Sequence, residues 1–162
     1  MTVMNKGREF EGIVGELFSR MGFYVERNKL MKGKSGAVHE IDVYGETRRS
    51  RQKRKRVAVE CKYKQNGDKV RKSDVANFLL KLEDLGLNEG YLVTNSSFSD
   101  YSVKTAGVYN VHLVDSEKLS RLLKKSGLSN YLSFLKSYKE NTLTDAVLSA
   151  INFLDELGVL KR

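Results

Sequence analysis

The sequence predicts an α/β fold in which a mixed central sheet is flanked by helices and followed by a small C-terminal helical appendage. Two patterns indicate this fold. Apolar residues recur at helical spacing in several segments, and short apolar or alternating runs typical of strands lie between them. Such an alternation is typical of a sheet that packs helices on its faces. The expected strands are 23–25, 38–44, 57–63, 90–94 and 111–114, and the expected helices are 6–21, 70–85, 100–109, 117–125, 128–138 and 143–158.

Residues at the ends of the expected helices support these boundaries. Gly22 and Gly127 follow helical patterns in the way that C-terminal glycines do. Ser99 or Asp100 can cap the third helix, and Ser116 can cap the fourth. Between the helices, strands 38–44 and 57–63 are expected to form a hairpin with a basic tip.

Alternation along the first strand of this hairpin predicts which side chains share a face. Ile41 and Val43 are expected on one face, and Asp42 on the other. From residue 128 onward only helical patterns occur, so we expect a domain over 1–127 and a helical tail over 128–162. The tail is too short to fold alone. A role for it in protein interaction or in forming a homodimer stays open.

Positive charge is concentrated in the first part of the 162-residue chain. The formal net charge is +9, and residues 1–72 carry 19 basic against nine acidic side chains. A localised basic surface favours a polyanionic partner. A single cysteine excludes an intramolecular disulfide and fits a reducing cytoplasm. No apolar run approaches the roughly 18 residues of a membrane span, so no membrane association is expected.

The residues Asp42 and Glu60-Cys61-Lys62 form the first candidate site. Glu60 and Lys62 are two positions apart on a strand and therefore project from one face, whereas Cys61 projects into the core. Pairing of the two strands can bring Asp42 beside Glu60. Carboxylate oxygens hold Mg²⁺ or Mn²⁺, and a nearby lysine can orient or help deprotonate a water. The alternative is an ordinary ion pair on a solvated strand face.

Glu11 is a second candidate, because it is a polar residue among core positions of the first helix. It can complete a metal site from that helix, or it can lie on the solvated helix edge, and Glu16 competes with it. His39 and His112 lie far apart without a Cys/His cluster and do not indicate zinc. Cys61 is expected to be a buried thiol.

The turn of the hairpin carries a dense basic run, which is the third candidate site. Seven like charges repel one another unless an anion is near, and nucleic-acid phosphates bind such charges largely independently of sequence. A solvated, flexible loop is the alternative. The candidate DNA-binding residues are Arg48, Arg49, Arg51, Lys53, Arg54, Lys55 and Arg56, with Lys34, Ser35 and Lys64 in neighbouring loops.

Four short motifs follow one another in a fixed order. They are Arg8-Glu9-Phe10-Glu11 leading to Met21-Gly22-Phe23, then Glu40-Ile41-Asp42-Val43, then Val59-Glu60-Cys61-Lys62, and finally Tyr91-Leu92-Val93-Thr94-Asn95 followed by Phe98-Ser99. In this order they resemble the PD-(D/E)xK nuclease superfamily, and within it the Mrr-like restriction endonucleases and the archaeal Holliday junction resolvases. The resemblance covers roughly residues 6–125 and leaves the helical tail outside.

The resemblance implies a restriction-endonuclease-like core and a Mg²⁺- or Mn²⁺-dependent endonuclease that acts on duplex or branched DNA. It implies that Asp42, Glu60 and the carbonyl of Cys61 bind the metal. Lys62 would be the motif lysine. Glu11, favoured over Glu16 by its spacing to the end of the first helix, would join the metal site. The alternative function is a DNA-binding module on a nuclease fold that does not cut.

The sequence departs from the motif in two respects. Ile41 occupies the position of the motif's proline, and the chain contains no proline. The basic insert between the two motif strands is long. It can dock DNA, or it can hinder a compact dimer on a branched substrate.

Overall fold

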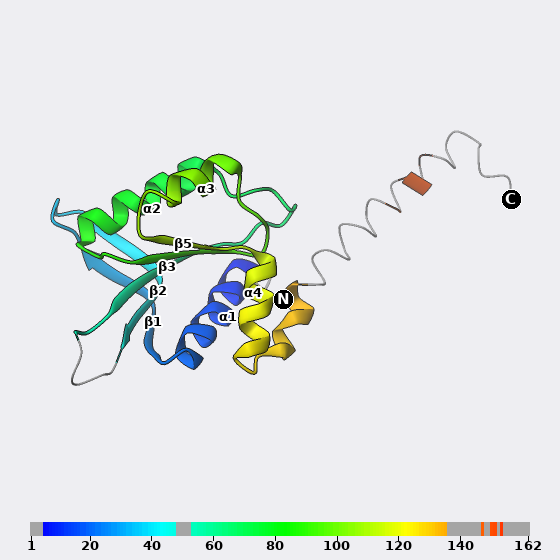
Figure 1. Cartoon of the computed structure of the whole chain (residues 1–162). Coiled ribbons are helices and arrows are strands. Elements are labelled where there is room, and N and C mark those ends of the chain that lie inside the picture. The colour runs from blue at the N-terminus through cyan, green and yellow to red at the C-terminus, as the bar shows by residue number, and fades with distance from the viewer. Residues whose placement is uncertain (1–4, 48–52, 136–146, 148–149, 152, 154–162) are drawn as a thin grey trace, which may run out of the picture.

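The computed structural model describes residues 5–47 and 53–135, together with residues 147, 150, 151 and 153. This part of the chain forms a five-stranded sheet with helices on both faces (Figure 1). The strands are β1 (Phe23–Lys32), β2 (Val38–Thr47), β3 (Arg56–Lys62), β4 (Gly90–Thr94) and β5 (Val111–Val114). The helices are α1 (Lys6–Arg20), α2 (Lys72–Leu85), α3 (Asp100–Ala106) and α4 (Ser116–Lys125), followed by the short 3₁₀ helix η1 (Ser129–Tyr131).

The sheet changes from antiparallel to parallel pairing at β3, which confirms the predicted mixed sheet. In the order β1-β2-β3-β4-β5, the first three strands pair antiparallel and the last three pair parallel. Parallel neighbours need a crossover connection, and α2 and α3 supply the two crossovers. The central strand β3 therefore belongs to both the hairpin and the parallel half of the sheet.

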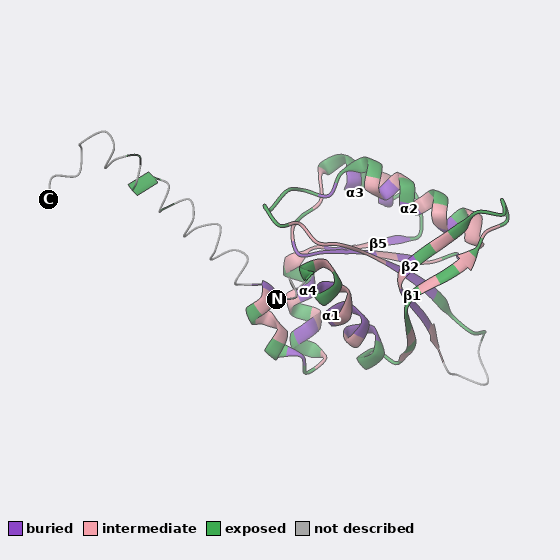
Figure 2. Cartoon of the chain, turned by 180° about the vertical axis from the view of Figure 1, so that it is seen from behind, coloured by how far each residue is buried: buried purple, intermediate pink, exposed green. Residues whose placement is uncertain are grey.

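Helices α1 and α4 cover one face of the sheet, and α2 and α3 cover the other (Figure 2). Each face has its own hydrophobic core, because side chains along a strand alternate between faces. The core under α1 and α4 includes Phe10, Val14, Leu17, Val43, Val59, Val93, Leu119 and Leu123. The core under α2 and α3 includes Ile41, Tyr44, Ala58, Val75, Phe78, Leu82 and Leu92.

The core under α1 and α4 continues into the first residues of the expected helical tail. Leu128 and Leu135 are buried in this core. The boundary between a domain over 1–127 and a tail over 128–162 stays a prediction, as does a homodimer. Of the second expected tail helix, only the four described residues between 147 and 153 can be compared, and they are helical.

Strand β1 is ten residues long, whereas the sequence predicted a strand of three residues followed by a loop. Its partner is β2, and the pairing runs from Phe23 opposite Thr47 to Lys32 opposite Val38. Every side chain of β1 is at least partly exposed, so its own sequence lacks the buried positions that would reveal a strand. The pairing with β2 therefore determines the length of β1.

Helices α2 and α4 begin at positions different from those predicted. The α2 helix starts at Lys72, because Val70 instead forms an isolated bridge with Phe98. In α4 the capping residue is Asp115, whose side chain accepts a hydrogen bond from the backbone of Lys118. None of the helices in the described part of the chain has the length and apolar character needed to cross a membrane.

Gly90, at the start of β4, offers a test of the packing between the sheet and α2. A Cβ atom there would lie 2.6 Å from Leu82 and 2.7 Å from Phe78. We expect Gly90→Ala to lower the free energy of unfolding by about 1–3 kcal/mol through overpacking. Chemical denaturation measures this change. Gly107→Ala is the control, because the new Cβ would meet its nearest atoms at 3.5 Å; equal stability of the two variants would contradict this packing.

Candidate active site

The hairpin of β2 and β3 brings Asp42 to the motif residues of β3, as its predicted pairing implied. The last regular pair at this end of the hairpin is Val43 with Val59. Asp42 and Glu60 are the next residues on their two strands. There the carboxylate of Asp42 accepts a hydrogen bond of 2.8 Å from the backbone N–H of Cys61. This bond ties Asp42 to β3 at the residue next to Glu60.

The alternation of β2 breaks at Asp42, which corrects the predicted orientation of its neighbours. Ile41 and Tyr44 pack in the core under α2 and α3, whereas Val43 packs in the opposite core. Ile41 and Val43 therefore do not share a face. The break coincides with an irregularity on the neighbouring strand, where Asn28 adopts a left-handed backbone with φ of 49° between the pairs Arg27–Val43 and Lys29–Ile41. Irregular strand geometry of this kind re-aims side chains at functional sites.

Asn28 also connects two acidic side chains. Its side-chain amide donates to Glu40 at 3.1 Å and to Glu11 at 3.4 Å. Glu11 is mostly buried and lies 3.5 Å from the guanidinium of Arg27. The irregular residue of β1 thereby links α1 to the site on β2.

The structure places Glu11, and not Glu16, beside the motif residues. The charge of Glu11 raises the pKa of Asp42, so the two carboxylates are near each other. Glu16 instead accepts a hydrogen bond from the hydroxyl of Tyr131 and lies 3.9 Å from Arg20. The role of Glu11 in metal binding stays a prediction.

Glu60 lies between two lysines, and both of its carboxylate oxygens are engaged. Lys62 lies 3.2 Å from one oxygen, so these two side chains share a face of β3, as predicted. Lys81 of α2 lies 2.9 Å from the other oxygen and also donates to the backbone carbonyl of Glu40 at 3.0 Å. The Glu60 side chain is 13% exposed.

Sequence reasoning missed Lys81. A weak signal was available, because this lysine lies three residues after the buried Phe78 and directly before the buried Leu82. Helical positions three or four apart share a face. Lys81 is thus at the border of the buried face of α2, where a charged side chain needs a partner.

The pKa of Asp42 is raised to about 6. Burial is the largest cause, and the charges of Glu60 and Glu11 add to it, whereas the Cys61 N–H and Lys81 oppose it. The ionised form of Asp42 is therefore disfavoured, chiefly by burial. Burial opposes the charged form of Lys62, but Glu60 outweighs this effect and the pKa of the ammonium is raised. Lys62 is consequently a cation at neutral pH and is suited to orient a water or to stabilise negative charge.

The donor set at this position suits a hard divalent cation. Mg²⁺ is commonly held by one or two carboxylates and keeps several waters, and Asp42, Glu60 and the carbonyl of Cys61 offer such oxygens. Across the described residues, however, no group of three or more His, Cys, Asp and Glu side chains is arranged to hold a metal ion. The thiol of Cys61 packs against the core under α1 and α4, and burial raises its pKa well above the ordinary value.

The described part of the basic run lies away from these carboxylates. The run leads into the start of β3 at Arg56, whereas Glu60 is four residues further, or about 13 Å along the strand. Lys55 pairs with Glu89 at 3.0 Å. Lys53 and Arg54 are exposed. The predicted contacts Arg48, Arg49 and Arg51 lie outside the described residues.

The predicted contacts Lys34 and Ser35 lie in the turn between β1 and β2. The backbone N–H and the hydroxyl of Ser35 both donate to Asp84 of α2 at 2.7 Å. His39 also contacts Asp84, at 2.6 Å, and with Ser35 it lowers the pKa of Asp84 to about 2. Ser35 therefore fastens the turn to α2. The side chain of Lys34 lies 3.8 Å from Glu83.

Lys64 lies just after the C-terminal end of β3, two residues beyond Lys62. Its backbone N–H donates to the side chain of Asn95 at 2.6 Å, and its carbonyl accepts from the amide of the same residue at 3.0 Å. Asn95 is buried just after β4. The segment that leaves β3 is thus anchored to the parallel half of the sheet.

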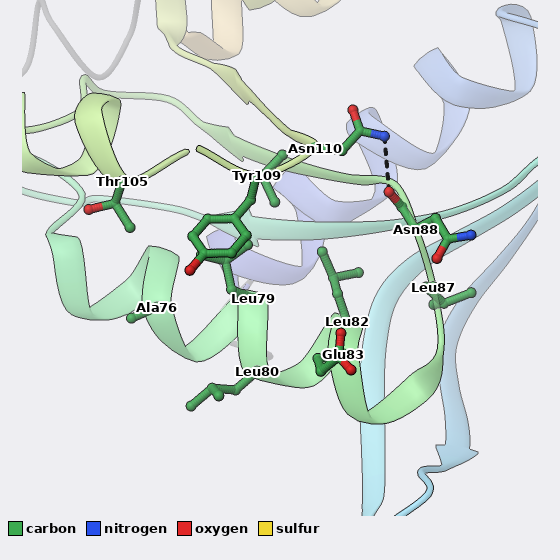
Figure 3. A pocket seen from close by; sticks show the side chains of 11 residues that line it. Ala76, Leu79, Leu80, Leu82, Glu83, Leu87, Asn88, Thr105, Tyr109 and Asn110 are labelled. Carbon is green, nitrogen blue, oxygen red and sulfur yellow. Dashed lines mark hydrogen bonds between the residues drawn. The ribbon is translucent and has the colours of Figure 1, made fainter. Parts of the chain in front are cut away.

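An apolar cavity lies apart from the acidic site. It has a volume of about 600 Å³ and is lined by α2, α3 and the segments before β4 and β5 (Figure 3). Leu79, Leu80 and Tyr109 face it, and the amide of Asn110 donates to the carbonyl of Asn88 at 2.9 Å at its edge. None of the candidate catalytic residues lines this cavity.

The fold and the Asp–Glu-x-Lys arrangement define a nuclease-like α/β domain. The family model described as restriction endonuclease, Mrr_cat, matches residues 3–123. The chain therefore belongs to the restriction endonuclease family. No curated protein matches the chain.

Solved structures show the same fold. The protein of unknown function AF1548 is 23% identical, with a TM-score of 0.64, over 74% of this chain and 67% of its own. The DNA modification-dependent restriction endonuclease AspBHI is 18% identical, with a TM-score of 0.56, over 82% of this chain and 35% of its own. The MspJI restriction endonuclease in complex with a 27-mer oligonucleotide is 19% identical, with a TM-score of 0.56, over 86% of this chain and 32% of its own. This chain thus corresponds to about a third of the length of the last two.

The raised pKa of Asp42 predicts that Asp42→Asn stabilises the metal-free protein at pH 8. The folded value of about 6 exceeds the ordinary 3.8, so the folded state binds more protons between these values and stability falls as the pH rises through them. The uncharged amide introduced by Asp42→Asn does not titrate, so the variant does not lose this stability as the pH rises. After allowance for partial exposure, we expect a gain of roughly 1–2 kcal/mol, which disappears near pH 4.

Thermal unfolding in EDTA at pH 8 and pH 4 measures this effect. The exposed Asp68 supplies the control variant Asp68→Asn, for which no gain is expected at either pH. Destabilisation by Asp42→Asn at pH 8 would contradict the prediction, because it would show that the ionised carboxylate does not lower the stability of the folded protein.

Proposed function

We propose that this chain is a divalent-metal-dependent DNA endonuclease that hydrolyses phosphodiester bonds. One observation carries the proposal: Asp42, Glu60 and Lys62 meet at the end of the β2–β3 hairpin, and burial raises the pKa of the Asp42 carboxylate. Membership of the restriction endonuclease family supports this reading of the site.

Each site residue has a role that follows from its chemistry. Asp42 and Glu60, with the carbonyl of Cys61, would hold Mg²⁺ or Mn²⁺, and Glu11 would add negative charge from α1. Bound metal supplies Lewis acidity to the phosphate and lowers the pKa of a water. Lys62, a cation beside Glu60, would orient the attacking water and stabilise the charge that develops on the phosphate.

DNA is the substrate that fits the charge of the chain. Beyond Lys62, the chain up to the first residue of α2 carries the basic residues Lys64, Lys69, Arg71 and Lys72, three of which are exposed. These cations follow the motif strand and can bind the phosphates around the scissile bond. The described part of the basic run would contact phosphates further along the DNA, because its last residue, Arg56, lies about 13 Å along the strand from Glu60. The oligonucleotide complex of MspJI supports the same class of substrate.

A DNA-binding module that does not cut is the second candidate. The observation in its favour is that lysines occupy both oxygens of Glu60. In that case the ion pairs would be purely structural, and DNA would bind without any requirement for a divalent cation. Dependence of cleavage on the motif residues separates the two functions.

We expect Asp42→Asn and Lys62→Met each to lower the rate of DNA cleavage in Mg²⁺ or Mn²⁺ by roughly 100-fold or more, since each removes charge that acts on the phosphate or the metal. The assay compares plasmid, linear duplex and branched DNA. Lys124→Met changes an exposed residue of α4 and serves as the control. Undiminished cleavage by both site variants would contradict the proposal.

A further inference from the structure

Lys81 joins α2 to both motif strands. Its ammonium lies 2.9 Å from Glu60 on β3 and 3.0 Å from the backbone carbonyl of Glu40 on β2. The Lys81 side chain is 22% exposed. The ammonium thus bridges the strand that carries Asp42 and the strand that carries Glu60.

This ion pair differs from the surface pairs of the same protein. Arg121 and Glu117 of α4, for example, are 65% and 81% exposed, and such pairs contribute little. Lys81 and Glu60 are largely shielded from water, where an ion pair is screened much less. The ammonium of Lys81 is therefore a substantial part of the electrostatic balance of the acidic site.

Metal binding and the Lys81 contact compete for the same carboxylate. One oxygen of Glu60 accepts from Lys62 and the other from Lys81, so both oxygens have a cation as partner. A divalent ion on Glu60 would lie within several ångströms of the Lys81 ammonium, and like charges at that separation repel strongly at low effective dielectric.

We propose that Lys81 is the counter-ion of the acidic site in the metal-free protein and that a divalent cation has to displace it from Glu60. This inference rests on the proposed function, in which Glu60 is a metal ligand. Lys81 is then a positioning residue that lowers metal affinity, and it keeps Glu60 neutralised while no metal is bound. Lys62 remains the lysine that acts on water and phosphate.

The test is the dissociation constant for Mn²⁺ at pH 8, measured by calorimetry on the full chain without DNA. We expect Lys81→Met to bind Mn²⁺ about tenfold more tightly than the wild type, because it removes a competing charge. Lys81→Arg keeps the charge and should retain weak binding. Lys124→Met, on the exposed side of α4, should match the wild type.

A second readout guards against a folding defect in the variant. Thermal unfolding with and without Mn²⁺ should show that Lys81→Met and Lys81→Gln are less stable than the wild type without metal and gain more stability from it. A cooperative unfolding transition in either variant is sufficient for the comparison.

The outcomes separate this inference from the proposed function. Unchanged or weaker Mn²⁺ binding by the Lys81 variants, with normal binding by the wild type, would overturn the role of Lys81 and leave the nuclease proposal standing. Binding by Lys81→Met alone would support the inference. Absence of Mn²⁺ binding by the wild type and by every variant would overturn both the role of Lys81 and the nuclease proposal. It would favour the DNA-binding module that does not cut.

Discussion

The hydrogen bond from the backbone of Cys61 to the carboxylate of Asp42 is the contact on which the site depends. It forms just beyond the last regular pair between β2 and β3, Val43 with Val59. It holds the Asp42 carboxylate against Cys61, between Glu60 and Lys62. Packing on both sides of the sheet fixes β3, since Val59 and Ala58 are fully buried in opposite cores. The two hydrophobic layers therefore fix β3, and the hydrogen bond from Cys61 places Asp42 against that strand.

The parts of the structure that depend on local patterns could be predicted from sequence. Buried strands such as β4 match their predicted ranges, because a run of apolar residues needs no knowledge of its partner. The length of β1 and the break of alternation at Asp42 could not be predicted, since both depend on how β1 pairs with β2 and on the backbone of Asn28. Lys81 was missed for a related reason: its partners, Glu60 and Glu40, are 21 and 41 residues away in sequence.

Opposite charges are separated along β3 in a way that the composition did not reveal. The positive excess of residues 1–72 suggested one basic surface around the motif residues. In the fold, the described part of the basic run and the carboxylates lie towards different ends of β3, and Lys55 is already paired with Glu89. The acidic site is balanced by Lys62 and Lys81 instead. A site neutralised in this way can stay folded without metal, and the basic run remains available for a polyanion at a distance.

Anomalous diffraction from crystals soaked in Mn²⁺ tests the central claim most directly, because it locates the ion without relying on activity. The account predicts one dominant peak within about 2.0–2.4 Å of oxygens from Asp42, Glu60 and the carbonyl of Cys61. The same crystal should show the Lys81 ammonium withdrawn from Glu60. A saturating soak that leaves these oxygens without a peak, or that places the ion elsewhere on the chain, would contradict the assignment of this site as a metal-dependent catalytic centre.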